Sequence, residues 1–189
     1  MGDSASQANA RSLREVLVGL DRFAQHEAAV RWARENNRVI DLFGSFASER
    51  HLMPFQSGNE CNNWIDPIDN VVYKMNMLVH VGEDILKLLD RIEIFNKLFP
   101  ELALRFIGFQ VMGESSAYPV FAQSFLSGAE FASQSEINEY MSSRGFASTG
   151  ENGVYSNGII ILSDIKPKNV LRTGNGGIAV IDAEIKYIQ

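Results

Sequence analysis

Helical spacing dominates the first part of the chain. Apolar residues recur at three- and four-residue intervals over 12–23, which predicts one helix there, and Ser12 with Glu15 fits a capping box at its start. An Ala-rich stretch over 26–37 ends in two Asn, which favours a second, short helix. We expect residues 1–11 to form a flexible tail and residues 12–50 to form the N-terminal helices.

Short alternating runs replace the helical pattern over 52–77. Turn-forming residues at 57–59 and 66–70 separate aromatic and β-branched segments, which predicts three antiparallel strands. A long helix is predicted next, and Pro100 marks its end. Its apolar face comprises Ile85, Leu88, Leu89, Ile92, Phe95 and Phe99.

Two more strands and a smaller C-terminal part complete the pattern. RFIGFQVM and YPVFAQSFL are predicted strands, and SQSE at the start of 133–143 favours a capped helix. Two later apolar runs, NGIIILSD and GGIAVIDAE, each contain an acidic residue at their end. We therefore expect an α+β fold, with a five-stranded antiparallel sheet and one long helix over 51–128 and a reduced part over 129–189.

Composition and charge limit the cellular compartments and the classes of partner that we expect. A chain of 189 residues that is 46% hydrophobic suits one folded domain with its own core. The net charge of −6 supplies no broad basic surface, so no nucleic-acid partner is expected. One cysteine cannot form an intramolecular disulfide, and no apolar run is long enough for a bilayer, so we expect no membrane location and a reducing cytoplasm.

The end of the chain contains a candidate cation site. Asn169 precedes one short apolar run and Asp182 follows the next, and RTGNGG between the runs suits a tight reversal. If the runs pair as an antiparallel hairpin, both residues lie at its open end, with an amide oxygen beside a carboxylate. Such oxygen ligands suit Mg²⁺.

A candidate catalytic loop leads into this hairpin. Asp164 lies five residues before Asn169, and Lys166 lies between them. One loop can thus present a carboxylate, an ammonium group and a metal ligand, which are the parts that phosphoryl transfer requires. The kinase catalytic loop H-R-D-x-x-x-x-N has the same interval between Asp and Asn.

A second candidate position lies upstream, in the third predicted strand. Lys74 occupies the middle of VVYKMN, and a kinase-type site needs a strand lysine for the α- and β-phosphates. A Glu on the following helix should pair with that lysine. Glu93 is the candidate, and Glu83 and Asp84 are the less suitable alternatives.

With these motifs the sequence resembles the protein-kinase superfamily. VVYKMN stands in place of V-A-I-K, SDIKPKNVL in place of the catalytic loop, and IDAE in place of D-F-G. More narrowly, it is similar to the polyvalent-type kinase domains of bacterial, Bacteroides-like mobile elements, through SGNECNNWIDPIDNVVYKMN, RIEIFNKLFPE, LRFIGF and YSNGIIILSDIKPKNVL.

The resemblance implies a minimal two-lobed kinase-like fold that binds ATP and Mg²⁺. It implies that Asp164 is the catalytic base and that Lys166 contacts the γ-phosphate. Lys74 would hold the other phosphates, and Asn169 with Asp182 would hold Mg²⁺.

The sequence also departs from the kinase pattern. Leu162 and Ser163 replace the His and Arg, and Ala183 and Glu184 replace the Phe and Gly. The predicted phosphate loop, SGNECNNW, has only Gly58 in place of three glycines. Few residues follow IDAE, so we expect the activation segment and the helical substrate platform to be missing or to be supplied by another chain or domain.

Three functions stay open at this point. The first is ATP- and Mg²⁺-dependent phosphoryl transfer to an unknown acceptor, for which a small molecule is the simpler choice. The second is a pseudokinase that binds nucleotide or protein without catalysis. The third is nucleotidyl transfer in the same pocket.

Overall fold

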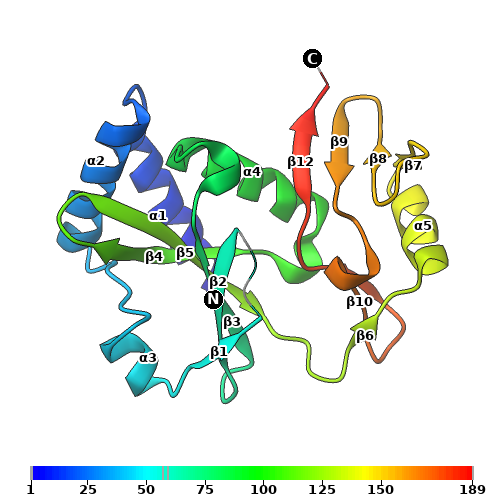
Figure 1. Cartoon of the computed structure of the whole chain (residues 1–189), viewed down its shortest axis with the longest axis horizontal. Coiled ribbons are helices and arrows are strands. Elements are labelled where there is room, and N and C mark those ends of the chain that lie inside the picture. The colour runs from blue at the N-terminus through cyan, green and yellow to red at the C-terminus, as the bar shows by residue number, and fades with distance from the viewer. Residues whose placement is uncertain (1, 57, 59, 189) are drawn as a thin grey trace. The chain divides into compact units, whose positions relative to one another are not determined.

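The computed structural model of the chain describes residues 2–56, 58 and 60–188 (Figure 1). Its helices are combined with antiparallel sheets, which confirms the predicted α+β class. Within these described residues, no helix is both long enough and apolar enough to cross a membrane.

Two compact units make up the chain. The first comprises Met1–Ile92 and Leu104–Phe125, and the second comprises Glu93–Ala103 and Leu126–Gln189. Helix α4 (Ile85–Leu98) begins in the first unit and ends in the second. The first unit contains the large sheet, and the second contains two small sheets.

The first unit is built on a five-stranded antiparallel sheet in the order β1-β2-β3-β5-β4. This sheet confirms the prediction of three short strands before the long helix and two strands after it. The strands are β1 (Met53–Phe55), β2 (Cys61–Asp66), β3 (Val71–Asn76), β4 (Arg105–Met112) and β5 (Ser116–Ser124).

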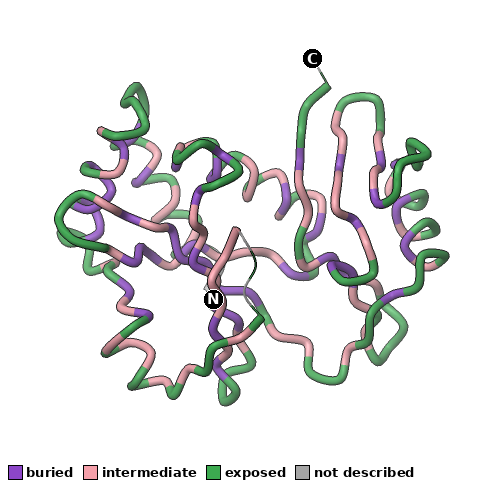
Figure 2. Tube along the Cα trace, viewed as in Figure 1, coloured by how far each residue is buried: buried purple, intermediate pink, exposed green. Residues whose placement is uncertain are grey.

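Helices cover one face of this sheet. Helices α1 (Gly2–Leu17) and α2 (Arg22–Glu35) contact β4 and β5, and the first turns of α4 contribute to the same apolar core (Figure 2). The predicted apolar face of the long helix is indeed buried or partly buried. The core side chains include Leu13, Leu17, Trp32, Ile85, Leu88, Leu89, Phe106, Phe109 and Phe121.

The other face of the sheet has its own, smaller core. Tyr73 and Met75 of β3 alternate with the residues that face the helices, and they pack with Leu42. Helix α3 (Ser45–Glu49) follows Leu42, and the ring of its Phe46 lies 5.2 Å from that of Tyr73. The sheet is thus covered on both faces, which fixes the alternation of side chains along β3.

The start of the chain differs from the prediction. Helix α1 begins at Gly2, within the segment that we expected to be a tail. Ser12 is therefore not an N-cap, and the predicted capping box with Glu15 is wrong. Ser12 lies inside the helix, where its Oγ accepts a hydrogen bond from Trp32 Nε1 at 3.2 Å. The contact with α2 decides the role of this serine, and local spacing could not predict it.

The first helix also ends earlier than predicted. Gly19 follows α1 with a left-handed φ of +80°, and Asp21 caps α2 by accepting hydrogen bonds from the N–H groups of Phe23 and Ala24. A glycine after a helix and an Asp before the next are ordinary stop and start signals. The apolar spacing continued through this break, which led to the wrong prediction of one helix through residue 23.

The second unit contains helix α5 (Gln134–Ser143) and two small antiparallel sheets, β11-β10-β6 and β12-β9-β8-β7. Ser133 and Glu136 form the predicted capping box at the start of α5. The strands are β6 (Glu130–Phe131), β7 (Ala147–Ser148), β8 (Tyr155–Ser156), β9 (Ile160–Ser163), β10 (Val170–Arg172), β11 (Ile178–Val180) and β12 (Glu184–Tyr187).

Strands β10 and β11 form the predicted hairpin. Val170 pairs with Val180 and Arg172 pairs with Ile178, and Gly176 in the turn has a φ of +83°. Strand β12 was not predicted, and it pairs with β9. The hairpin and β9 are the elements that position the polar residues of this unit.

Candidate functional site

A polar loop, defined as residues 164–169, connects β9 to β10. Asp164 has a left-handed φ of +59°, and a 3-10 turn over Pro167–Asn169 leads into β10. A residue other than glycine is uncommon in this backbone region and carries strain. The surrounding contacts must therefore hold Asp164 in this conformation.

Asp164 is the centre of those contacts. Lys166 Nζ lies 3.1 Å from Asp164 Oδ1, and Lys168 Nζ lies 3.0 Å from Oδ2. Asn169 Nδ2 donates hydrogen bonds to the backbone carbonyl of Asp164 at 2.9 Å and to Oδ2 at 2.8 Å. Asn169 is buried, whereas the Lys168 side chain is 65% exposed. The structure thus brings together three predicted residues, Asp164, Lys166 and Asn169.

These contacts keep Asp164 ionised. Burial by itself raises the pKa of Asp164, but hydrogen bonds from Lys168, Lys166 and Asn169 outweigh burial and hold the pKa below its usual value. An ionised carboxylate accepts hydrogen bonds and cannot donate them. Asp164 is therefore suited to receive a hydrogen bond from a hydroxyl group.

The open end of the hairpin contains the predicted metal ligands. Ile181 N–H donates to the carbonyl of Asn169 at 2.9 Å, so the pairing of the hairpin extends beyond Val170 and Val180. Asp182 is the next residue and is exposed. Because Asn169 Nδ2 is used by Asp164, its amide oxygen is the atom left to bind a cation. An amide oxygen and a carboxylate fit Mg²⁺ chemically, and their joint binding of the ion stays a prediction.

Two residues that depart from the kinase pattern contact each other. Ser163 pairs with Glu184 across β9 and β12, and Ser163 Oγ donates a hydrogen bond to Glu184 Oε2 at 3.0 Å. The strand that leads into Asp164 is thereby joined to the strand that follows Asp182. A sheet links the two predicted motifs in the second unit.

Lys74 lies in the central strand of the large sheet. It is partly buried and lies opposite Asn63 of β2 and Phe121 of β5. Directly paired residues of antiparallel strands share a face, so Lys74 lies on the Phe121 side of the sheet. That face is the one covered by α1, α2 and the first turns of α4. The structure thus places Lys74 in the predicted strand, on the face toward the long helix.

Glu93 lies on the part of α4 that belongs to the second unit. Its Oε1 lies 2.7 Å from Lys97 Nζ. A pairing of Glu93 with Lys74 stays a prediction. Asp84, one of the alternatives, accepts a hydrogen bond from Lys87 N–H at 3.0 Å and so caps the start of α4.

The predicted phosphate loop, SGNECNNW, starts between β1 and β2, but its second half, from Cys61 onward, is part of strand β2. Ser57 and Asn59, which belong to it, lie outside the described residues. Gly58 N–H donates to the carbonyl of Cys61 at 3.1 Å. A Cβ added at Gly58 would meet no described atom within 4 Å, so packing does not require a glycine there. Its role at a phosphate stays a prediction.

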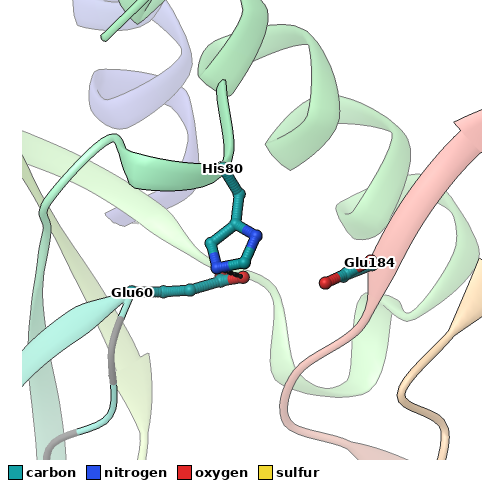
Figure 3. A group of neighbouring side chains, drawn as sticks. All are labelled: Glu60, His80 and Glu184. Carbon is teal, nitrogen blue, oxygen red and sulfur yellow. Dashed lines mark ion pairs between the residues drawn. The ribbon is translucent and has the colours of Figure 1, made fainter. Parts of the chain in front are cut away.

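A glutamate of this loop, just before β2, contacts a histidine. Glu60 Oε1 lies 2.9 Å from Nε2 of His80, a residue of the 3-10 turn Val79–Val81 (Figure 3). The carbonyl of Glu60 also accepts a hydrogen bond from Met77 N–H at 2.7 Å. These contacts join the residue before β2 to the segment after β3. Glu184, also drawn in Figure 3, belongs to the second unit.

Sequence reasoning missed two residues that contact Asp164 or Lys166. Lys168 lies four residues after it, and this spacing could have suggested the ion pair. Gly153 packs against Lys166 from a separate turn. No local pattern connects Gly153 with the polar loop, because the contact depends on how β8 and β9 pair.

Comparison with known proteins gives one family match. A protein-family model that describes a serine/threonine/tyrosine kinase found in polyvalent proteins matches residues 23–189. No curated protein and no solved structure matches the chain. The matched range contains β3 with Lys74, the polar loop and the hairpin, and it confirms the resemblance to polyvalent-type kinases. The chain therefore belongs to the family of serine/threonine/tyrosine kinases found in polyvalent proteins.

Proposed function

We propose that the chain transfers the γ-phosphoryl group of ATP to a hydroxyl acceptor and requires Mg²⁺. Its family is one of kinases. The observation that carries the proposal is the polar loop, where Lys166 and buried Asn169 hold the Asp164 carboxylate. Catalysis of phosphoryl transfer rests mainly on positioning and electrostatic stabilisation. A carboxylate fixed between an ammonium group and a metal ligand supplies both.

In this proposal Asp164 orients the acceptor hydroxyl and takes its proton. The lowered pKa of Asp164 keeps it ionised at neutral pH, so it can accept the hydrogen bond of the hydroxyl. A carboxylate with a lowered pKa is also a weak base. Orientation is therefore the larger contribution. The proton passes from the hydroxyl to Asp164 late, as the bond from the acceptor oxygen to the γ-phosphorus forms and the bond from that phosphorus to the leaving ADP breaks.

The other site residues bind the nucleotide and the metal. Asn169 and Asp182 would hold Mg²⁺, which would supply positive charge against the negative charge that develops on the phosphoryl group. Lys166 adds a positive charge at the γ-phosphoryl group. The remaining roles are assigned to Lys74 at the α- and β-phosphates, Glu93 as its partner, Gly58 at the backbone approach to phosphate, and Asn169 with Asp182 at Mg²⁺.

The two units correspond in this proposal to two kinase lobes. The first unit, with the five-stranded sheet and Lys74, supplies the N-terminal lobe, and the second supplies a reduced C-terminal lobe. A reduced lobe suits a small-molecule acceptor. A protein acceptor would need a docking surface from another chain or domain.

ATP labelled at either the γ- or the α-phosphate tests the proposal. Incubation with a panel of hydroxyl acceptors should transfer the γ-label, and only when Mg²⁺ is present. Asp164→Asn should slow the transfer by about 100-fold, as expected for loss of a positioned acid–base group. Asp69→Asn, which changes an acid in the β2–β3 turn, should have no effect. Transfer of the α-label instead would indicate nucleotidyl transfer and contradict the proposal.

A pseudokinase is the second candidate, and one observation favours it. Lys168 also contacts the carboxylate of Asp164, so three side chains already engage the group that must receive the acceptor. A pseudokinase would bind Mg²⁺-ATP without releasing or transferring the label. Its partner binding would then survive Asp164→Asn.

A further inference from the structure

A turn outside the polar loop supports Lys166. This turn, residues 149–154, joins β7 to β8 in the second unit. Thr149 N–H donates to the carbonyl of Val154 at 3.1 Å, and Val154 N–H donates to the carbonyl of Glu151 at 3.2 Å. The turn is therefore closed by its own backbone hydrogen bonds and has a defined shape.

Gly153 of this turn makes two contacts with the polar loop. Its carbonyl accepts a hydrogen bond from Ile165 N–H at 3.0 Å. A Cβ added at Gly153 would lie 2.7 Å from Lys166 Cγ, 3.0 Å from Lys166 Cε and 3.2 Å from the carbonyl oxygen of Ile165. The aliphatic part of Lys166 thus lies directly against the glycine backbone, with no room for a methyl group.

The packing of the Lys166 stem lowers the entropic cost of its ion pair with Asp164. A lysine side chain has several rotatable bonds, and holding its ammonium group in one place costs conformational entropy. Packing of the Lys166 stem against a fixed backbone removes alternative rotamers before any substrate binds. A charge that is already in place needs no reorganisation when the reaction occurs.

We propose that Gly153 is a positioning residue, which lets the stem of Lys166 pack against the 149–154 turn and so holds its ammonium group at Asp164. The inference rests on the proposed phosphoryl transfer, since that function makes the position of the ammonium group matter for a rate. Gly153 acts through Lys166.

Gly150 provides a matched control in the same turn. Both glycines have a left-handed φ, +92° at Gly150 and +74° at Gly153. Substitution of either by alanine therefore introduces backbone strain. A Cβ at Gly150 would meet no described atom within 4 Å, so only Gly153→Ala pushes against Lys166.

Competitive acetylation with acetic anhydride tests the contact without phosphoryl transfer. Mass spectrometry of the full chain compares labelling at Lys166 with that at the exposed Lys87 of α4, which serves as an internal reference. Gly153→Ala should raise the relative labelling of Lys166 several-fold, and Gly150→Ala should leave it unchanged. Unchanged labelling in Gly153→Ala, or the same rise in Gly150→Ala, would overturn the proposal.

A stability cycle covers the case in which Gly153→Ala folds poorly. Lys166→Ala removes the atoms that the new methyl group would meet. Gly153→Ala should therefore lower the melting temperature less in the Lys166→Ala background than in the wild type. Equal losses in the two backgrounds would show that the methyl group does not act through Lys166.

Kinetics test the consequence for the reaction. Gly153→Ala should lower kcat by about tenfold with KM for ATP unchanged, and should cause no further loss in Lys166→Ala. Independent, multiplicative losses would contradict the inference. If the wild type has no activity, the proposed function is wrong. The labelling and the stability cycle still show whether Gly153 acts on Lys166.

Discussion

Asn169 has two roles in this account. Its Nδ2 holds both the carbonyl and the carboxylate of Asp164, and its oxygen is assigned to Mg²⁺. It is also buried, so loss of its side chain would leave the strained backbone at Asp164 without its main internal support. We therefore expect the same residue to matter for stability and for catalysis.

Asn169→Ala tests this at the residue scale. It should lower kcat by about 100-fold, as for a lost preorganised hydrogen-bond donor. It should also lower the free energy of unfolding by about 1–3 kcal/mol, since two partly buried acceptors of Asp164 lose their partner. Asn175→Ala, an exposed change in the turn of the same hairpin, is the control, expected within about 0.5 kcal/mol of wild type. If the two variants had similar kinetics, Asn169 would have no role in the reaction.

Prediction of single residues succeeded where chemistry and spacing act within one short segment. The interval between Asp164 and Asn169, with Lys166 inside it, was sufficient to predict that these three lie together. Contacts that depend on tertiary packing were not predictable. Gly153 is the example, because a turn remote from the polar loop in sequence brings it to Lys166.

At the scale of elements, the β2–β3 hairpin supports Lys74. Buried Asp66 accepts hydrogen bonds at 3.0 Å from the N–H groups of Ile68 and Asp69, and it pairs with Arg50 at 3.3 Å. Burial by itself raises the pKa of Asp66, but these hydrogen bonds outweigh burial and lower the pKa. The charged carboxylate therefore stabilises the turn.

Asp66→Asn should reveal this stabilisation through pH. The unfolded pKa of an Asp is about 3.9, and a folded pKa below it gives stability that is complete above that pH and lost as pH falls through the folded pKa. The difference in unfolding free energy between wild type and variant should thus stay constant from neutral pH to about 5, and shrink below about pH 4. A constant difference down to pH 2 would contradict the assignment.

The pairing of β9 with β12 offers a second test at this scale. Ser163→Ala should lower the free energy of unfolding by about 1 kcal/mol, because the half-buried Glu184 loses a hydrogen bond. The same loss should nearly vanish in a Glu184→Ala background. Equilibrium denaturation of the four proteins measures this coupling, and full additivity would show that the contact contributes nothing.

Elements with strong, local signals were predicted well. The five strands of the large sheet, the apolar face of α4 and the capping box of α5 all follow from side-chain periodicity or from capping residues. The start of α1 and strand β12 were not predicted. In the second unit, β12 forms by pairing with β9, which its own short sequence does not specify.

At the scale of the whole molecule, the net negative charge contrasts with the positive side chains of the polar loop. The chain has a net charge of −6, yet Lys166 and Lys168 lie together at one loop. Binding of a phosphate group must therefore depend on a few placed residues and not on a general basic surface. The proposed residues come from both units, with Lys74 in the first and Asp182 in the second.

Thermal stability with and without Mg²⁺-ATP, measured on wild type, Lys74→Ala and Asp182→Ala, tests this central claim most directly. Ligand at about 100 times its Kd should stabilise the wild type by about 2.7 kcal/mol. The account predicts that this gain requires Mg²⁺ and is lost in both variants, because Lys74 is assigned to the phosphates of the nucleotide and Asp182 to Mg²⁺. No gain in the wild type at millimolar nucleotide, or an undiminished gain in either variant, would contradict it.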